Sequence, residues 1–116
     1  MRVINRTRQT VLVENGWVAS SYWARMVGLL GRRELEPGKG LLLKGEQAIH
    51  MFGMRFPIDV VYLDAENRVL RQIEGLKPWR VGPYLRKSRN VLELPIGTLA
   101  ATHTRTGDEL VFDFTS

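Results

Sequence analysis

Only one segment of this chain has the apolar spacing of an α-helix, and that segment is about three turns long. Its apolar residues recur at intervals of three and four: Tyr22, Trp23, Met26, Val27, Leu29 and Leu30. Ser20 and Ser21 precede it as good N-cap residues, and Gly31 is suited to end it in a left-handed conformation. A chain with so little helix has to bury its other apolar residues mainly in β-structure.

The rest of the sequence consists of short apolar or alternating runs separated by turn residues, which is typical of β-strands. The runs that predict strands are Val3–Ile4, Val11–Val13, Leu41–Leu43, Ala48–Phe52, Ile58–Asp64, Val69–Glu74, Asn90–Leu94 and Leu110–Phe114. Asn67 separates two of them and predicts a hairpin turn. We expect one domain over residues 1–116, with a mainly β fold: a compact small barrel or sandwich with one short α-helix.

The composition excludes several classes of protein. The chain has no cysteine, which excludes disulfides, thiolate metal ligands and a cysteine nucleophile. Its apolar runs are far too short to span a bilayer, so no membrane span is expected. Arg2, Arg6 and Arg8 interrupt the first residues, where a secretory signal would need a continuous apolar stretch. We therefore expect a cytoplasmic protein.

The distribution of charge favours an anionic ligand or nucleic acid as partner. Lys and Arg number 17 against 12 Asp and Glu, which gives a net charge of +5. No acidic residue occurs from Gly75 to Leu92, and the prolines and glycine of this stretch indicate a loop. The cations and aromatic residues of this basic loop are Lys77, Trp79, Arg80, Tyr84, Arg86, Lys87 and Arg89. Exposed rings beside cations would bind RNA or DNA, whereas rings packed into the core would make the loop a plain connection.

One acidic residue lies within the strongest predicted strand. Because side chains alternate along a strand, Asp59 shares a face with Val61 and Leu63, and that face is expected to be buried. A buried carboxylate needs a hydrogen-bonding or basic partner. Either backbone N–H groups satisfy Asp59 in a structural role, or Asp59 anchors a polar ligand-binding pocket. The residues predicted to form such a pocket are Arg32, His50, Arg55 and Asp59.

Several short motifs follow one another along the chain. They are GLLGR at 28–32, GLLL at 40–43, HMFGMRFPID at 50–59, YLD at 62–64, LELPIG at 92–97 and GD at 107–108. In these motifs the chain resembles the domain-of-unknown-function 192 family of small prokaryotic proteins. The resemblance extends over nearly the whole chain and is most specific between Met51 and Asp64. It implies a compact mainly β barrel or sandwich with a short helix, and it implies no particular activity.

No recognisable catalytic motif accompanies these features, so the sequence leaves open whether the chain is an enzyme. His50 and His103 lack the spacing of a metal-ligand pair, and no metal or cofactor is predicted. His50 and Asp59 are nevertheless candidates for the acid–base pair of a small hydrolase. Three hypotheses follow: a non-catalytic binding or accessory module with a polar pocket near Asp59, an RNA- or DNA-binding module, and that hydrolase. The first is our prediction from the sequence.

Overall fold

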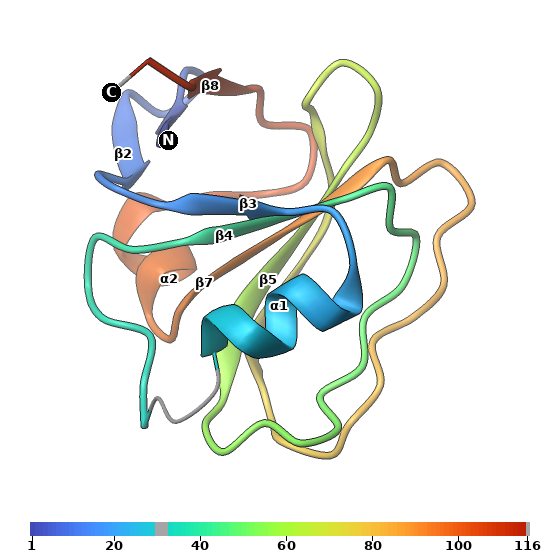
Figure 1. Cartoon of the computed structure of the whole chain (residues 1–116). Helices are drawn as coiled ribbons and strands as arrows, with labels where there is room; N and C mark the ends of the chain where they lie inside the picture. The colour runs from blue at the N-terminus through green and yellow to red at the C-terminus, as the bar shows by residue number, and fades with distance from the viewer. Residues whose placement is uncertain (30–32, 116) are drawn as a thin grey trace.

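A five-stranded sheet runs through the middle of the protein, whose computed structural model describes residues 1–29 and 33–115 (Figure 1). Its strands lie in the order β3 (Trp17–Ala19), β4 (Leu41–Lys44), β7 (Asn90–Pro95), β5 (Ile58–Leu63) and β6 (Val69–Leu76). β3 and β4 are parallel, and the other neighbours are antiparallel. β7 therefore occupies the centre of this sheet, and β6 forms one edge.

A smaller sheet of three strands lies on one side of the first. Its order is β2 (Thr10–Val13), β1 (Arg2–Asn5) and β8 (Leu110–Asp113), and both pairs are antiparallel. Val3 of β1 lies opposite Phe112 of β8, so segments from near both ends of the chain meet here. Figure 1 shows this sheet at the upper left, with both termini beside it.

Two short helices complete the fold. α1 (Tyr22–Leu29) packs against β3 and β4, and α2 (Thr98–Thr102) packs against β2, β6 and β7. The hydroxyl oxygen of Ser21 accepts the backbone N–H of Ala24 at 3.1 Å, which confirms its predicted capping position. None of the helices among the described residues has the length and apolar character that crossing a membrane requires.

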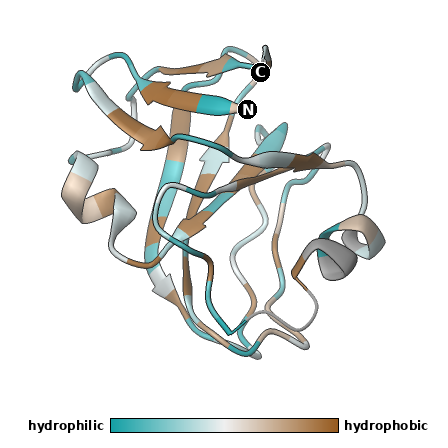
Figure 2. Cartoon of the chain, turned by 60° about the vertical axis from the view of Figure 1, so that its left-hand side comes forward, coloured by the Kyte–Doolittle hydropathy of each residue, from teal (hydrophilic) through white to brown (hydrophobic). Residues whose placement is uncertain are grey.

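Both faces of the five-stranded sheet are covered, which explains why its central strands are apolar on both sides (Figure 2). One face packs against the smaller sheet and α2, and its buried residues include Val61, Leu63, Leu92, Leu94, Val3, Val13 and Leu99. The other face packs against α1 and the segment after β4, and its buried residues include Val60, Tyr62, Leu41, Leu43, Leu29, Ile49 and Met51. Every residue of β5 is buried in consequence.

The structure confirms the mainly β fold with a short first helix and most of the predicted strands. The predicted strand over Ala48–Phe52 is wrong, because the backbone hydrogen bonds of this segment to the loop beside it form the isolated bridge His50–Val81 and no continuous strand ladder. The sequence does not predict β3 or α2. β3 is three residues long and α2 five, which is too short for either period to show.

Candidate functional site

Asp59 is fully buried, as its position in the strand predicts, and backbone N–H groups occupy both of its carboxylate oxygens. Oδ1 accepts from Gly75 of β6, and Oδ2 accepts from Leu99 of α2, each at 2.9 Å. The carboxylate therefore joins β5 to the edge strand and to the second helix. Of the two alternatives considered for Asp59, these contacts match the structural one, in which backbone N–H groups satisfy the carboxylate.

The structure does not gather the predicted pocket residues around Asp59. Asp59 lies on the face of β5 that packs against the smaller sheet, whereas His50 lies between Ile49 and Met51, which pack on the opposite face. Arg55 is exposed, and Arg32 lies outside the described residues. Because the sheet separates His50 from Asp59, the two side chains do not form the acid–base pair that the hydrolase hypothesis requires.

A buried ion pair that the sequence analysis misses lies beneath His50. Nε of Arg25 in α1 donates to Oε1 of Glu93 in β7, and neither side chain has any exposed surface. Nη1 of Arg25 also donates to the carbonyl oxygen of His50 at 3.1 Å, and Nη2 lies 3.7 Å from Sδ of Met51. Arg25 thereby links α1 to both the central strand and the segment that carries His50.

Burial dominates the electrostatics of this pair. It raises the pKa of Glu93 from an ordinary 4.5 to about 7, although the charge and the hydrogen bond of Arg25 act in the opposite direction. Oε2 of Glu93 is buried and accepts no hydrogen bond within the described part of the chain. Burial and the charge of Arg25 both lower the pKa of His50, because each disfavours the protonated imidazole.

The pair had a signal in the sequence. Arg25 occurs at i+3 from Tyr22 and at i−4 from Leu29, on the apolar stripe of the helix. Glu93 stands between Leu92 and Leu94 in a strand that is apolar on both faces. Two opposite charges at such positions predict a buried pair, although the sequence does not show that they meet.

The basic loop, Lys77–Arg89, is held firmly along the segment that follows β4. Met51 donates its backbone N–H to the carbonyl of Arg80 at 2.8 Å and accepts the N–H of Trp79 at 2.9 Å. Gly82 donates to the carbonyl of Ile49, and Leu85 donates to the carbonyl of Gln47, each at 2.8 Å. The backbone of the loop is therefore fixed at several points along its length.

The aromatic side chains of the loop point outward. Trp79 is 67% exposed and Tyr84 is 65% exposed, so neither ring packs into the core. The Trp79 ring centroid lies 6.1 Å from that of Phe52, which in turn lies 5.1 Å from the imidazole of His50. We call these three rings, His50, Phe52 and Trp79, the aromatic row. The backbone of Trp79 has φ of 66°, a strained value for a bulky residue that its N–H bond to Met51 maintains.

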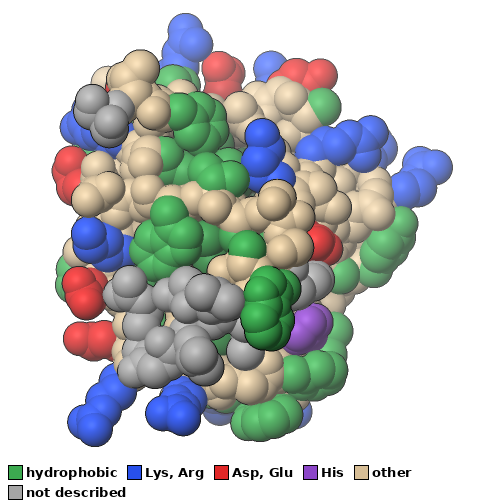
Figure 3. Space-filling view, viewed as in Figure 1, with side chains coloured by type: hydrophobic (Ala, Val, Ile, Leu, Met, Phe, Trp, Pro, Cys, Tyr) green, Lys and Arg blue, Asp and Glu red, His purple; other side chains and the backbone are tan. Residues whose placement is uncertain are grey.

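The cations of the basic loop are not neutralised by carboxylates of the described residues. Lys77, Arg80, Arg86, Lys87 and Arg89 are all exposed. None of them forms an ion pair with a carboxylate of residues 1–29 or 33–115. Figure 3 shows Lys and Arg side chains together with hydrophobic side chains along the right-hand edge, where Figure 1 shows the loop leading into β7. This edge is a basic surface with protruding rings.

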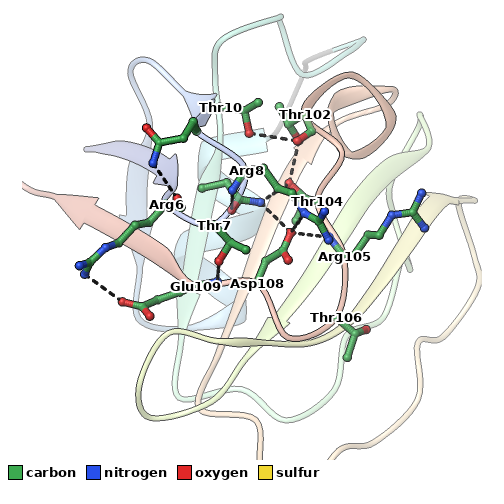
Figure 4. A network of polar contacts seen from close by, with 12 residues as sticks. Arg6, Thr7, Arg8, Thr10, Thr102, Thr104, Arg105, Thr106, Asp108 and Glu109 are labelled. Atoms are coloured by element: carbon green, nitrogen blue, oxygen red, sulfur yellow. Dashed lines mark hydrogen bonds and ion pairs between the residues drawn. The ribbon is translucent and has the colours of Figure 1, made fainter.

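A third buried acid, Asp108, is held by hydrogen bonds within the protein (Figure 4). Its Oδ2 accepts from Nδ2 of Asn5 at 3.0 Å, from Nε of Arg8 at 3.0 Å and from the N–H of Arg105 at 2.9 Å. Burial raises the pKa of Asp108, but these three hydrogen bonds and the charge of Arg8 together hold it below its ordinary value. The network ties the turn before β8 to the end of β1.

Comparison with known proteins gives a consistent result. The model of the family DUF192, described as "Uncharacterized ACR", matches residues 3–112. A UPF0127 protein of Thermococcus sibiricus is 27% identical over 112 residues, which cover 93% of this chain and 72% of that one. A UPF0127 protein of Pyrococcus abyssi is 26% identical over 114 residues, which cover 93% of this chain and 94% of that one. These matches confirm the resemblance seen in the motifs.

Two crystal structures have the same fold. A protein of unknown function from Novosphingobium aromaticivorans superimposes with a TM-score of 0.78 at 20% identity, over 96% of this chain and 82% of that one. A protein from Sinorhizobium meliloti, described as a putative transcription regulator, superimposes with a TM-score of 0.74 at 25% identity. That match covers 95% of this chain and 89% of the other.

Proposed function

We propose that this chain, which belongs to the DUF192 family, is a binding module for single-stranded nucleic acid. The contact surface is formed by the aromatic row and the basic loop. The observation that carries the proposal is that Trp79 and Tyr84 are exposed although the backbone that bears them is fixed. In a loop without ordered backbone contacts, exposed side chains need no explanation. This loop is hydrogen-bonded to the segment that follows β4, and its rings are exposed nevertheless.

The chemistry of the surface matches both parts of a nucleotide. Bases stack on aromatic rings at about 1–3 kcal/mol per base with little dependence on sequence. Phosphates are neutralised by Lys and Arg, of which the basic loop contributes five without competing carboxylates. A side chain on a fixed backbone also loses less conformational entropy when it binds. The surface therefore provides rings for stacking and cations for phosphates, and its fixed backbone reduces the conformational entropy that is lost on binding.

Single strands fit this surface better than duplexes. In a duplex the faces of the bases are stacked on one another and are closed to a protein ring. Duplex readers place a helix or a two-stranded ribbon in the major groove, whereas here the exposed rings stand on loops. The Sinorhizobium relative is described as a putative transcription regulator, and that description is compatible with the same class of partner.

Anisotropy of a fluorescein-labelled oligouridylate or oligothymidylate, titrated with the protein at several salt concentrations, tests the proposal. We expect saturable binding whose affinity falls with salt, with a logarithmic slope of about 0.7 per phosphate contacted. An unlabelled duplex of the same length should compete poorly. Binding that is absent, or that does not depend on salt, would contradict the proposal.

Two pairs of variants locate the surface. Trp79→Ala should weaken binding by the stacking of one base, about 5- to 150-fold, whereas Phe114→Ala removes an exposed ring just after β8 and should have no effect. Arg86→Gln should reduce the salt slope, whereas Arg6→Gln removes the same charge next to the smaller sheet and should leave it unchanged. Equal effects within either pair would show that binding is not localised to this surface.

A further inference from the structure

A separate cavity lies between β6 and the segment that contains α2. Its volume is about 220 Å³. Pockets for drug-sized ligands usually measure some 300–1,000 Å³, so this one suits a smaller molecule. Its lining consists of the polar residues Gln72, Glu74, His103, Thr104 and Arg105 and the apolar residues Leu99 and Ala100.

The buried carboxylate of Asp59 sets the two walls of this cavity. It binds the N–H of Gly75, next to Glu74 on one wall, and the N–H of Leu99 on the other, each at 2.9 Å. α2 ends at Thr102, and the φ of 56° at the next residue, His103, turns the chain so that Arg105 lines the same cavity. This cavity is distinct from the predicted pocket, because its lining includes none of His50, Arg55 and Asp59.

Opposite charges face this cavity without neutralising each other. Neither Glu74 nor Arg105 has an ion-pair partner in the part of the chain that the structure describes. Figure 4 shows the guanidinium of Arg105 directed away from Asp108, which binds only the backbone N–H of that arginine. A simple anion in the cavity would meet the carboxylate of Glu74, and a simple cation would meet the guanidinium of Arg105.

We infer that this cavity binds a small zwitterion of the α-amino acid class. The ligand's carboxylate pairs with the guanidinium of Arg105, and its ammonium pairs with the carboxylate of Glu74. The Gln72 carbonyl already accepts from Oγ1 of Thr106 at 2.7 Å, which leaves its NH₂ to donate to the ligand's carboxylate. Leu99 and Ala100 are the apolar residues of the lining and would contact the short side chain of such a ligand.

Isothermal titration calorimetry with L-alanine, N-acetyl-L-alanine and L-alaninamide tests this inference, because the three probes share a side chain and differ in charge. We expect saturable binding of L-alanine and affinities at least about tenfold weaker for the two analogues, each of which lacks one charge. No saturable binding of L-alanine, or equal binding of either analogue, would overturn the inference.

Variants then test the assignment of residues. Glu74→Gln and Arg105→Gln should each weaken L-alanine binding by about tenfold or more, and both residues are exposed, so the fold should persist. Arg86→Gln, on the basic loop, is the matched control and should leave this affinity unchanged. An equal loss in the control, or no loss in the two cavity variants, would also overturn the inference.

Discussion

The guanidinium of Arg25 and the carboxylate of Glu93 meet inside the protein, between the first helix and the central strand of the larger sheet. Both side chains are completely buried, and one oxygen of Glu93 accepts no hydrogen bond within residues 1–29 and 33–115. A buried pair of this kind contributes little net stability over apolar residues, but each charge depends on the other once both are buried.

Arg25→Met should therefore destabilise the protein strongly. It leaves Glu93 buried without its cation, at a cost of about 3–5 kcal/mol in the free energy of unfolding. Urea denaturation followed by circular dichroism measures this cost. Arg33→Met, at an exposed position after the same helix, is the control and should change stability by less than about 0.5 kcal/mol. The double variant Arg25→Met/Glu93→Leu should recover most of the loss, and failure to recover it would contradict the assigned dependence.

The raised pKa of Glu93 predicts a specific pH dependence. The unfolded carboxyl titrates near 4.5 and the folded one near 7, so between these values the folded state binds more protons than the unfolded state. Stability from this group is therefore full below about pH 4.5 and falls as pH rises from there through 7, by on the order of 3 kcal/mol. Glu93→Gln should remove this fall, as denaturation midpoints at a series of pH values would show. If the denaturation midpoints of the wild type and of Glu93→Gln change with pH in the same way, Glu93 is not the source of the pH dependence.

Asp59→Ala should destabilise the protein because it leaves the buried N–H of Leu99 and the half-buried N–H of Gly75 without an acceptor. At about 1–3 kcal/mol for each group, we expect a loss of 2–5 kcal/mol in the free energy of unfolding. Asp59→Asn keeps one acceptor oxygen and should lose less. Hydrogen exchange of these two amides provides a local readout, and protection equal to wild type in Asp59→Ala would contradict the contacts.

Asp108 predicts the opposite response to acid. Its folded pKa is lower than its unfolded value, so its stabilising contribution is present above the unfolded value and is lost as pH falls through the folded one. Asp108→Asn should weaken the links to Asn5 and Arg8, at a cost of roughly 1–3 kcal/mol near neutral pH. The difference between the two proteins should shrink in acid. A constant difference down to the acid transition would show that this carboxylate does not contribute through its charge.

Gly82→Ala should displace the basic loop. An added Cβ would lie 2.4 Å from Oη of Tyr62 and 2.7 Å from Cγ2 of Ile49, both inside the closest normal contact. Overpacking of this kind costs about 1–3 kcal/mol. Because Gly82 also fixes the loop by its hydrogen bond to Ile49, oligonucleotide affinity should fall in a variant that remains folded. A folded variant with unchanged affinity would show that the position of the loop does not matter for binding.

The fold could be predicted further from the sequence than the site. Apolar residues at every second position predicted most of the strands. The alternation of side chains along β5 also predicted correctly that Asp59 is buried. The partners of Asp59 could not be predicted, because they are backbone groups of elements 16 and 40 positions away. The sequence also does not predict whether the rings of Trp79 and Tyr84 are exposed or packed into the core. The backbone hydrogen bonds of the loop decide this, and they are known only from the structure.

The pairing of β1 with β8 has a consequence for how the protein is made. Asn5 and Asp108 are hydrogen-bonded although they are 103 positions apart in sequence. While the ribosome is still producing the segments between them, β1 has no β8 to join, and the apolar face that the smaller sheet later covers stays open to solvent. Contacts of such long range also slow folding. The apolar face of the larger sheet is therefore fully covered only after β8 has emerged from the exit tunnel.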